Sequence, residues 1–392
     1  MTSGRRNFRD ATIFTRPMGR LETTITSVAL AEGFVLAGFA RLERLDDRAS
    51  FFSHWLAEDR AAEMVWLARD PGRRIDPRLL DPRLHTVISL AYPYAPPRPP
   101  DLDWRSELRG RIAAYAIGAD YHDTVLAKAR SVAAALERHV PAATIRLYVD
   151  TGPILEREWA TRARLGWFGR NTNLLNRYYG SYFFLAEILT DVVLESSGEP
   201  YRDHCGTCRR CLDLCPTGAL TDGYLLEPRV CISYLTIEHR GPIPRELRPK
   251  LGNWIFGCDI CQEVCPWNDD RTAAALVSND LMPSLAELLT LDAGGFSRRF
   301  RGSAIKRTKR RGLLRNAAIA LGNSGNPAAL PILAHTLDSE PESLVRAHAA
   351  WAIGQLGGAE ARRLLDHSRS REPDTSVQNE IEAALSGLHG LP

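Results

Sequence analysis

The stretch that decides the fold is CGTCRRCLDLCPTGAL at residues 205–220, in which four cysteines are spaced as C-x2-C-x2-C-x3-C and followed by Pro216. This spacing is typical of bacterial ferredoxins, in which three cysteines bind one [4Fe–4S] cluster and the fourth binds a second cluster. A shorter copy, GCDICQEVCPWN at 257–268, has Ile255 where its first cysteine would stand. Cys231, which lies between the two copies, is the obvious replacement.

All eight cysteines of the chain lie between Cys205 and Cys265. Structural zinc would require paired C-x2-C units, which the three-cysteine run fits poorly. Disulfides would require an oxidising compartment, which nothing in the sequence indicates. We therefore predict two [4Fe–4S] clusters, and the crossed pairing of the ferredoxin run divides the cysteines into two complete sets. The first set is Cys205, Cys208, Cys211 and Cys265, and the second is Cys215, Cys231, Cys258 and Cys261.

The composition is that of an ordinary soluble globular protein, with 392 residues of which 44% are hydrophobic and 25% charged. This length predicts two or three domains. No uninterrupted apolar stretch approaches the roughly 18 residues of a membrane span, and the first 20 residues lack the apolar segment of a secretory signal. We expect a cytoplasmic monomer without a membrane segment.

The pattern of apolar residues and expected secondary structure changes three times along the chain. These changes predict an α+β protein with several domains. Strands alternate with helices at first, as in a layered α/β domain, whereas the cysteine segment has too few apolar residues for a core of its own. Near the C-terminus AIALG at 318–322 matches AWAIG at 350–354, and this spacing of 32 predicts a HEAT-like α-solenoid. The expected regions are a flexible tail at 1–20, the α/β domain at 21–195, the ferredoxin-like segment at 196–270 and the helical domain at 271–392.

Asp150 ends a strand expected over residues 145–149. The residues that follow, TGPILEREW, predict a helix that Thr151 caps and whose first turn contains Pro153. Open α/β sheets place ligand sites at such strand ends. A carboxyl group there acts as a general acid if burial keeps it protonated, or it caps the turn through its own side chain. Position alone leaves both interpretations open.

Other features of the first half are less specific. GWFGRNTN at 166–173 would let a planar ligand approach the backbone, although a plain turn is the favoured interpretation. An isolated histidine such as His122 is more often structural than functional. The sequence has no glycine-rich dinucleotide motif, no phosphate loop and no D-x-H-x-x-G cobalamin motif. The residues alone thus indicate an iron–sulfur protein with an unidentified site beside its clusters.

Several segments together resemble the epoxyqueuosine reductases, which make the last step of queuosine synthesis on tRNA. The segments are AYAIGADYH (114–122), VDTGPILEREWA (149–160), LGWFGRNTN (165–173), CISYLTIEHRGPIP (231–244) and the two cysteine segments quoted above. The resemblance implies cobalamin bound base-off, without a histidine ligand, in the α/β domain. It also implies two [4Fe–4S] clusters that pass electrons to cobalt, a flavodoxin- or ferredoxin-like external donor, and tRNA carrying epoxyqueuosine as the substrate.

The resemblance also assigns roles to single residues. Asp150 matches the proton donor of the family, and this role requires a pKa raised towards neutrality. Arg170 stands where we expect lysine. Arginine keeps the positive charge of lysine but differs from it in shape. The residues expected to contact cobalamin are Arg73, Tyr115, His122, Asp150, Asn171, Ser181 and Ser233.

The charge is strongly sorted near the start of the helical region, where residues 296–315 contain nine Lys or Arg and no acid. Such a stretch can contact the phosphates of tRNA, and binding would then weaken steeply with salt. The alternative is a solvated helix face. The residues expected to contact tRNA are Lys306, Arg307, Lys309, Arg310, Arg311 and Arg315.

Two other functions compete with the reductase. A reductive dehalogenase also couples cobalamin to two ferredoxin-type clusters, but it acts on small organohalides and needs no basic segment. A non-catalytic electron carrier or tRNA-binding scaffold would share the clusters and would bind no corrin.

Overall fold

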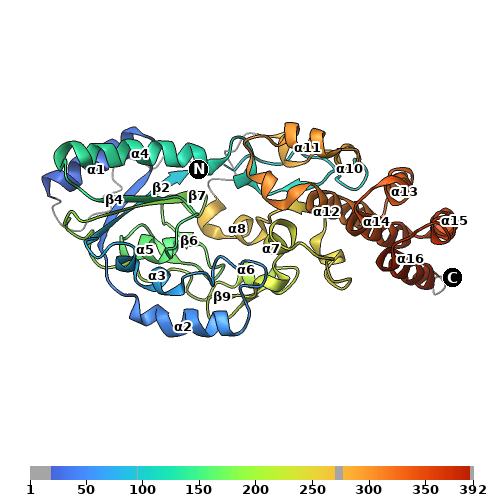
Figure 1. Cartoon of the computed structure of the whole chain (residues 1–392), viewed down its shortest axis with the longest axis horizontal. Helices are drawn as coiled ribbons and strands as arrows, with labels where there is room; N and C mark the ends of the chain where they lie inside the picture. Colours follow the sequence, from blue (N-terminus) through green and yellow to red (C-terminus); the bar gives the residue numbers. More distant parts are fainter. Residues whose placement is uncertain (1–18, 95, 270–276, 389–392) are drawn as a thin grey trace, which may run out of the picture.

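The computed structural model describes residues 19–94, 96–269 and 277–388. The α/β half lies at one end of the long axis, the cysteine-rich segment in the middle, and stacked helices at the other end (Figure 1). Of the predicted N-terminal tail, only its last two residues are described, and the second of these, Arg20, begins the first helix. Among the described residues, no helix is both long enough and apolar enough to span a membrane.

The core of the first half is an antiparallel sheet of four strands in the order β1-β2-β7-β4. The rule that ligands bind at the carboxyl ends of parallel strands, which drew attention to Asp150, therefore does not apply here. The elements of this half are α1 (Arg20–Ala31), β1 (Leu36–Arg41), α2 (Asp46–Ala57), α3 (Pro71–Ile75), β2 (Thr86–Pro93), β3 (Arg111–Ile112), α4 (Tyr121–His139), β4 (Ile145–Tyr148), α5 (Glu156–Arg162), β5 (Trp167–Phe168), β6 (Leu174–Leu175) and β7 (Phe183–Thr190).

Helices cover both faces of this sheet, which confirms the layered α/β prediction. Helices α1 and α4 pack on one face, where Ile188 of β7 meets Val125 and Leu136 of α4. Helix α5 packs on the other face, where Trp159 lies in one core with Leu189. Side chains alternate between the faces along a strand, and this alternation brings Glu187 of β7 to the α5 side. Glu187 is completely buried.

Helix α5 begins four residues later than the sequence predicts, at Glu156, and no side chain caps its first turn. The prediction of a helix capped by Thr151 was wrong, because residues 150–155 form a separate loop. Arg74 of α3 donates a hydrogen bond to the carbonyl of Gly152, and this bond connects α3 to the loop. A Cβ on Gly152 would stand 2.5 Å from Cγ of Tyr148, so the loop also packs closely on β4.

The cysteine segment has little secondary structure and shares its core with neighbouring regions, as its composition predicts. Strand β10 pairs in parallel with β3, and Ile255 and Phe256 lie in one core with Leu235 and with Leu313 of the C-terminal helices. Its elements are α6 (Arg210–Asp213), β8 (Leu220–Thr221), β9 (Leu225–Leu226), α7 (Ile232–Ile237), β10 (Trp254–Phe256) and α8 (Ile260–Glu263).

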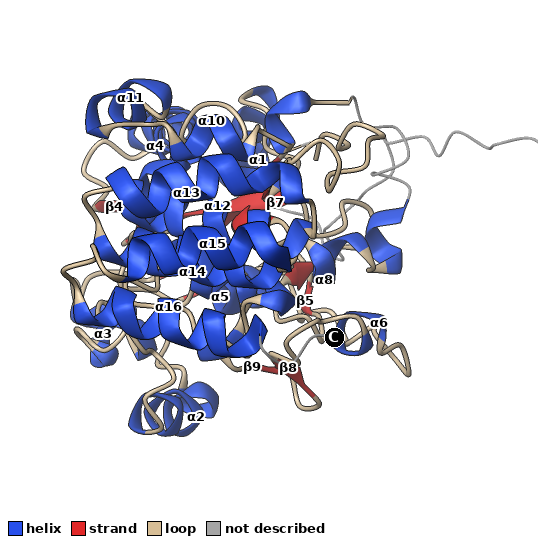
Figure 2. Cartoon of the chain, turned by 90° about the vertical axis from the view of Figure 1, so that its right-hand side faces the viewer, coloured by secondary structure: helices blue, strands red, loops and turns tan. Residues whose placement is uncertain are grey.

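The C-terminal helices form the expected HEAT-like stack and lie side by side in Figure 2. The matching glycines of the repeat explain its spacing. A Cβ on Gly322 would stand 2.9 Å from Cα of Ala352, and one on Gly354 would stand 2.6 Å from Cβ of Ala384. The helices are α10 (Leu285–Leu289), α11 (Ala293–Arg299), α12 (Lys309–Ser324), α13 (Leu330–Ser339), α14 (Ser343–Leu356), α15 (Gly358–Arg369) and α16 (Thr375–Leu388).

Candidate functional site

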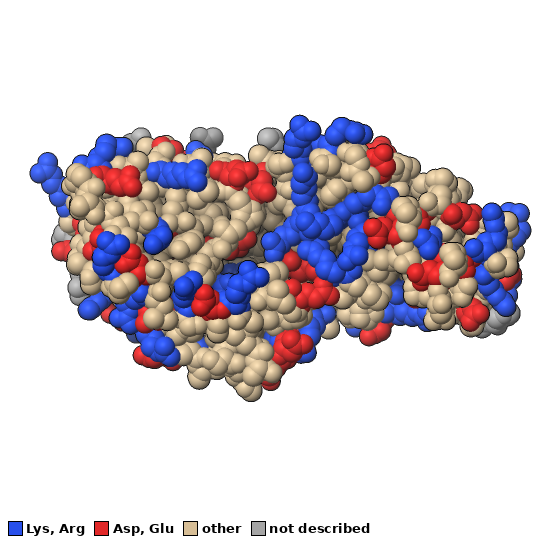
Figure 3. Space-filling view, viewed as in Figure 1, with Lys and Arg blue, Asp and Glu red and all other residues tan. Residues whose placement is uncertain are grey.

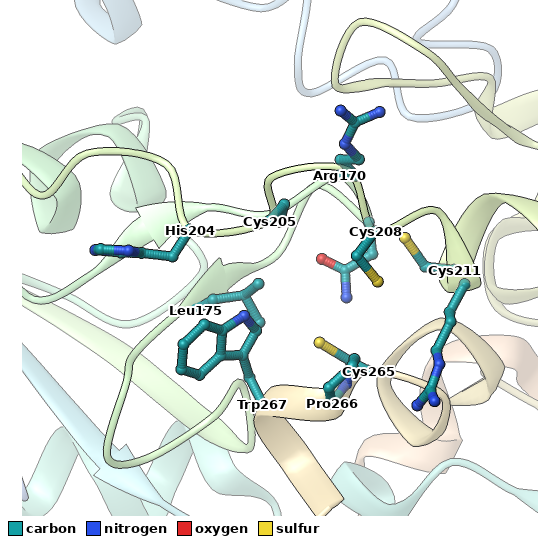
Figure 4. A pocket seen from close by; sticks show the side chains of 11 residues that line it. Arg170, Leu175, His204, Cys205, Cys208, Cys211, Cys265, Pro266 and Trp267 are labelled. Carbon is teal, nitrogen blue, oxygen red and sulfur yellow. The ribbon is translucent and has the colours of Figure 1, made fainter.

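The first group of cysteines lines a cavity of about 240 Å³ at the edge of the α/β half. The sulfurs of Cys208, Cys211 and Cys265 face the same space, beside Trp267 (Figure 4). Cys205 lines the same cavity. The structure thus brings together the four residues of the first predicted set, although Cys265 is 50 residues or more away from the others in sequence.

The second group lies deeper in the protein. The thiols of Cys231, Cys258 and Cys261 interact electrostatically, and Cys215 acts on Cys231 and Cys261. Burial raises the pKa of Cys231, Cys258 and Cys261 above that of an ordinary thiol. Bound iron would hold these sulfurs as thiolates despite this cost.

The thiol arrangement fits clusters better than single ions. All eight thiols are free of disulfides. Among the residues with described positions, no three Cys, His, Asp or Glu side chains converge as closely as one metal ion requires. A four-iron cube separates its cysteine sulfurs more widely than a single ion does, and so it suits a cavity ringed by four thiols.

Asp150 lies on the loop between β4 and α5, and its side chain is 57% exposed. Its carboxylate accepts a hydrogen bond from the Tyr121 hydroxyl at 2.9 Å and lies 3.1 Å from Nε2 of His122. Its backbone φ is +60°, a left-handed conformation that few residues other than glycine adopt. Asp150 is therefore both accessible to a bound molecule and held in a strained conformation.

The electrostatics of this loop correct one prediction. Burial alone would raise the pKa of Asp150, but hydrogen bonds from His122 and Tyr121 and the charge of Arg307 bring it below the ordinary value. Burial lowers the pKa of His122, but Asp150 and Asp120 outweigh burial and raise it. The expectation of a raised pKa at Asp150 was wrong for the protein without substrate, because an imidazolium pairs with the carboxylate.

Aromatic rings form a row that leads away from Asp150. Tyr121 stacks between His122 and Phe184, with ring centroids 4.0 and 4.2 Å apart, and Tyr94 continues the row at 4.7 Å from Phe184. Tyr182, 5.6 Å from Tyr94, interacts electrostatically with Cys261. The row thus extends from the Asp150 carboxylate to the second group of cysteines.

Both ring nitrogens of His122 are engaged, because Nδ1 lies 2.7 Å from Asp120 and Nε2 contacts Asp150. This histidine has no lone pair to offer a metal, which agrees with a corrin bound without a histidine ligand. Tyr115 lies beside this site, with its ring 6.0 Å from that of Tyr121. Partly exposed aromatic side chains beside an accessible carboxylate suit a large cofactor.

The other residues expected to contact cobalamin differ in their positions. Asn171 donates to the carbonyl of Cys261, and Ser181 donates to Gln262, so both lie against the second cysteine segment. Ser233 contributes a backbone N–H that lowers the pKa of Cys231. Arg73 pairs with Asp70 at 3.0 Å and is half exposed.

Two further cations lie close to the site residues. Arg170 donates to Asp222 and to the Gly206 carbonyl, and its guanidinium points away from the cavity (Figure 4). Arg74, next to Arg73, is the residue that contacts the Asp150 loop.

Sequence reasoning missed two acids next to Asp150. The Glu156 carboxylate accepts the backbone N–H of Asp150 at 2.5 Å. Glu187, on the neighbouring strand β7, is within hydrogen-bonding reach of Glu156. A charged residue in the otherwise apolar strand FFLAEILT was the available signal for Glu187.

The basic segment forms a dense area of Lys and Arg on the face shown in Figure 3, over the start of the helical region. Lys306, Arg307, Lys309 and Arg311 are exposed. Arg307 donates to Glu238 at 2.5 Å and stacks on Trp66, and its charge acts on Asp150. This segment therefore adjoins the Asp150 site.

Of the six residues expected to contact tRNA, Arg310 and Arg315 are bound to other parts of the protein. Arg315 is completely buried and donates to the carbonyls of Leu235, His239 and Gly241. Its prediction as a phosphate contact was wrong, because α12 turns this side chain into the core. Arg310 makes a bidentate pair with Glu340, which links the start of α12 to the end of α13.

Three family models match the chain in order. "Epoxyqueuosine reductase QueG, DUF1730" matches residues 74–151, "4Fe-4S double cluster binding domain" matches 204–268, and "HEAT repeats" matches 302–386. The middle match covers both groups of cysteines and the last covers the stacked helices. Together they define an iron–sulfur protein with a reductase region and a helical-repeat region.

Curated relatives share a single name. An epoxyqueuosine reductase of Xanthomonas campestris pv. campestris is 40% identical over 336 residues, which are 83% of this chain and 93% of that protein. The epoxyqueuosine reductase of Leadbetterella byssophila is 38% identical over 297 residues, or 75% of this chain and 96% of that protein. That of Escherichia coli K12 is 37% identical over 318 residues, 78% of this chain and 82% of the relative.

Solved structures agree with these relatives. An epoxyqueuosine reductase with an epoxyqueuosine-modified tRNA-Tyr stem loop has a TM-score of 0.85 and 30% identity, covering 95% of this chain and 99% of that one. A Bacillus subtilis structure, described with its catalytic aspartate loop swung out of the active site, has the same TM-score and identity and covers 94% and 99%. Fold and site thus define an oxidoreductase of the class that acts on tRNA. The chain belongs to the epoxyqueuosine reductase family.

Proposed function

We propose that this protein reduces epoxyqueuosine to queuosine at the wobble position of tRNA, using cobalamin and electrons from two [4Fe–4S] clusters. The observation that carries the proposal is the position of Asp150. Its accessible carboxylate, paired with His122, begins an aromatic row that ends at the second group of cysteines. A proton source and an electron source would thus meet at one site.

The two cysteine groups would hold the clusters in the crossed sets. Cys205, Cys208, Cys211 and Cys265 would bind the outer cluster, and Cys215, Cys231, Cys258 and Cys261 the inner one. The outer group lies at a cavity near the surface, where an external flavodoxin- or ferredoxin-like protein can deliver electrons. The inner group adjoins the aromatic row and would pass them on.

Cobalamin would lie beside the aromatic row, next to Tyr115, His122 and Asp150. When bound, it would supply the two electrons that remove the epoxide oxygen. Asn171 and Ser181, which bond to the second cysteine segment, and Ser233, which lies next to Cys231, would contact the edge of cobalamin. Arg73 would contribute only if the Arg73–Asp70 pair opened.

Asp150 would give a proton to the epoxide oxygen as negative charge develops there. In the protein alone this carboxyl is ionised and paired with His122. Covering the 57% exposed side chain with cofactor and substrate would desolvate the carboxylate and raise its pKa. The proton of His122 would then pass to Asp150 and on to the epoxide oxygen, which would become a hydroxyl group as its first C–O bond breaks. A second proton, delivered from solvent through the same two residues, would let this oxygen leave as water when the second C–O bond breaks.

The exposed Lys306, Arg307, Lys309 and Arg311 would bind tRNA phosphates beside the site. Phosphate contacts position the nucleic acid but read no sequence. The modified base must leave its stack to reach Asp150, as in other enzymes that act on a nucleobase. Because the substrate is tRNA, we expect the protein to act in the cytoplasm, as a monomer.

The test is an anaerobic incubation of the reconstituted protein with cobalamin, a strong reductant and tRNA that carries epoxyqueuosine. Digestion and mass spectrometry of the nucleosides should show loss of one oxygen atom, dependent on added cobalamin. Unchanged epoxyqueuosine, with iron and cobalt both shown to be bound, would refute the proposal.

A further inference from the structure

Two cysteines of the inner group stand on separate segments that meet in the core. Cys231 is the residue before α7, and Cys258 follows the end of β10 by two residues. Both belong to the same crossed set, and they would also share a cluster if each cysteine segment bound its own. A cluster held by both cysteines requires the two segments to keep one relative position.

The hydroxyl group of Thr236 joins these two segments. It donates to the carbonyl of Ile232 at 2.7 Å and accepts the backbone N–H of Gly257 at 2.9 Å. Ile232 directly follows Cys231 in the chain. Gly257 directly precedes Cys258. A threonine in a helix often bonds to the carbonyl four residues earlier, but here the same oxygen also binds a second segment.

The segment around Cys258 has little freedom to adjust. Gly257 has a φ of +68°, and a Cβ at this position would stand 2.5 Å from the Cβ of Ala113. On the other side of Cys258, the carboxylate of Asp259 accepts the backbone N–H of Ala114 at 2.6 Å. Cys258 is therefore fixed between two neighbours that are each bound to another part of the protein.

Side chains of the helical region hold Thr236 in place. Helices α7 and α12 lie side by side (Figure 1). The last carbonyls of a helix have no donor within the helix, and those of α7 find donors from outside it. The Thr236 carbonyl accepts hydrogen bonds from the Thr308 hydroxyl at 2.8 Å and from Nδ2 of Asn316 at 2.9 Å. Asn316 also donates to the carbonyl of Ile255 in β10 at 2.8 Å, so it contacts both segments.

This network of hydrogen bonds is buried throughout. Oδ1 of Asn316 accepts from Nε and Nη2 of Arg315 at 3.0 and 2.9 Å, and this orients the amide. Thr236, Thr308, Arg315 and Asn316 are each at most 1% exposed. Any other arrangement of these groups would leave buried polar atoms without partners, which is costly. The network therefore favours a single position for the residues next to the cysteines.

We propose that Thr236 is a positioning residue for the inner cluster, and that Thr308 and Asn316 of the helical region hold Thr236 for this purpose. The helical region would then serve the inner cluster as well as tRNA. The inference rests on the proposed function in one respect, which is that Cys231 and Cys258 bind the same cluster. It requires neither cobalamin nor turnover.

The matched variants Thr236→Val and Thr236→Ser separate the hydroxyl group from the rest of the side chain. Valine places a methyl group against the Gly257 N–H, whereas serine keeps the hydroxyl. Removing a contact that orients metal ligands typically costs about 10- to 100-fold in metal affinity. We expect a chelator to remove the inner half of the iron faster by a similar factor in Thr236→Val. The outer half, and all of the iron in Thr236→Ser, should be released as in the unaltered protein.

The measurement is the anaerobic release of iron from the full-length, cluster-loaded protein to a coloured ferrous chelator. The double variant Cys208→Ala/Cys211→Ala lacks the outer cluster, and the effect of Thr236→Val should persist in it. The double variant Cys231→Ala/Cys258→Ala lacks the inner cluster, and the effect should vanish there. Equal acceleration of both clusters by Thr236→Val would overturn the proposal, because it would show a general loosening of the fold. No acceleration would overturn it as well.

Thr308→Val tests the part assigned to the helical region. It removes one of two donors to the Thr236 carbonyl and leaves Asn316, so it should accelerate the same release by a smaller factor. Thr336→Val is the matched control, because this threonine of α13 is also buried and donates to the Ile332 carbonyl of its own helix at 2.8 Å. Thr336→Val should leave both clusters unchanged. Equal release from Thr308→Val and Thr336→Val would refute a role of the helical region.

The outcomes for this inference and for the proposed function can be distinguished. If Thr236→Val does not fold, Thr308→Val compared with Thr336→Val decides. Selective loss of the inner cluster from Thr236→Val, combined with an unaltered protein that cannot convert epoxyqueuosine, would disprove the proposed function alone. Conversion by the unaltered protein, combined with a normal inner cluster in Thr236→Val, would disprove this inference alone.

Discussion

Nε2 of His122 lies 3.1 Å from Oδ2 of Asp150, while the other ring nitrogen of His122 lies 2.7 Å from Oδ1 of Asp120. An imidazole between two carboxylates is held in its protonated form and oriented by both. This relationship makes the Asp150 carboxylate the acceptor of a nearby proton rather than a permanently neutral acid. It changes how the proton step is expected to depend on pH.

Replacing Asp150 with asparagine should remove the proton donor and leave the rest of the site intact. We expect turnover to fall by about 100-fold or more, in the range found for general acids. Iron content and the visible absorbance of the clusters should not change, and neither should cobalamin binding. Near-normal turnover of Asp150→Asn would eliminate the assigned role.

Replacing His122 with glutamine should slow the reaction most at high pH. His122 lowers the pKa of Asp150, so its loss should raise that pKa and let solvent protonate the carboxyl as the pH falls. The rate of His122→Gln divided by that of the unaltered protein, measured from pH 8 to pH 6, should therefore increase. A ratio independent of pH would show that His122 does not supply the proton.

Paired cysteine variants should distinguish crossed from local cluster binding. In the crossed sets Cys205 and Cys215 belong to different clusters, so the double variant Cys205→Ala/Cys215→Ala should lose nearly all of its iron. The double variant Cys211→Ala/Cys265→Ala removes two ligands of one cluster and should retain about half. Iron analysis of anaerobically reconstituted protein checks both. Local binding by residues 205–215 would give the opposite pattern.

The exposed part of the basic segment should govern the salt dependence of tRNA binding. Lys306→Ala, Lys309→Ala and Arg311→Ala together should weaken binding and reduce the slope of log affinity against log salt. The slope should fall by about 0.7–0.9 for each phosphate that the variant no longer neutralises. Filter binding or fluorescence anisotropy at several salt concentrations measures it. An unchanged slope would show that these residues form only a solvated face.

Arg315 provides the matched contrast within the same segment. Its guanidinium donates to three backbone carbonyls inside the protein, so Arg315→Gln should leave buried acceptors without partners. We expect a loss of stability of about 3 kcal/mol or more, seen as a lower midpoint of urea unfolding. A reduced salt slope for tRNA binding without any loss of stability would restore the original prediction of a phosphate contact.

The parts of the fold that local patterns determine could be predicted from the sequence. Cysteine spacing was sufficient to group distant residues such as Cys211 and Cys265, because a cluster imposes its own geometry. The matching Gly322 and Gly354 revealed the helical repeat, because close helix packing requires a small residue at the same place in each unit.

What could not be predicted depends on tertiary contacts. Nothing local distinguishes Arg73 from Arg74, yet only Arg74 turns towards the loop. Arg315 could not be distinguished from the other cations of the basic segment. The direction of its side chain is set by the packing of α12 and not by its sequence neighbours. The late start of α5 follows from contacts of the loop with Arg74 and Tyr148, which a capping pattern cannot show.

Conversion of epoxyqueuosine on tRNA is the most direct test of the central claim. Reconstituted protein, cobalamin, a strong reductant and epoxyqueuosine-tRNA are incubated without oxygen, and the digested nucleosides are weighed by mass spectrometry. We predict a nucleoside lighter by one oxygen atom, formed only when cobalamin is added and absent with Asp150→Asn. Unchanged epoxyqueuosine in protein that holds both clusters and the corrin would contradict the account.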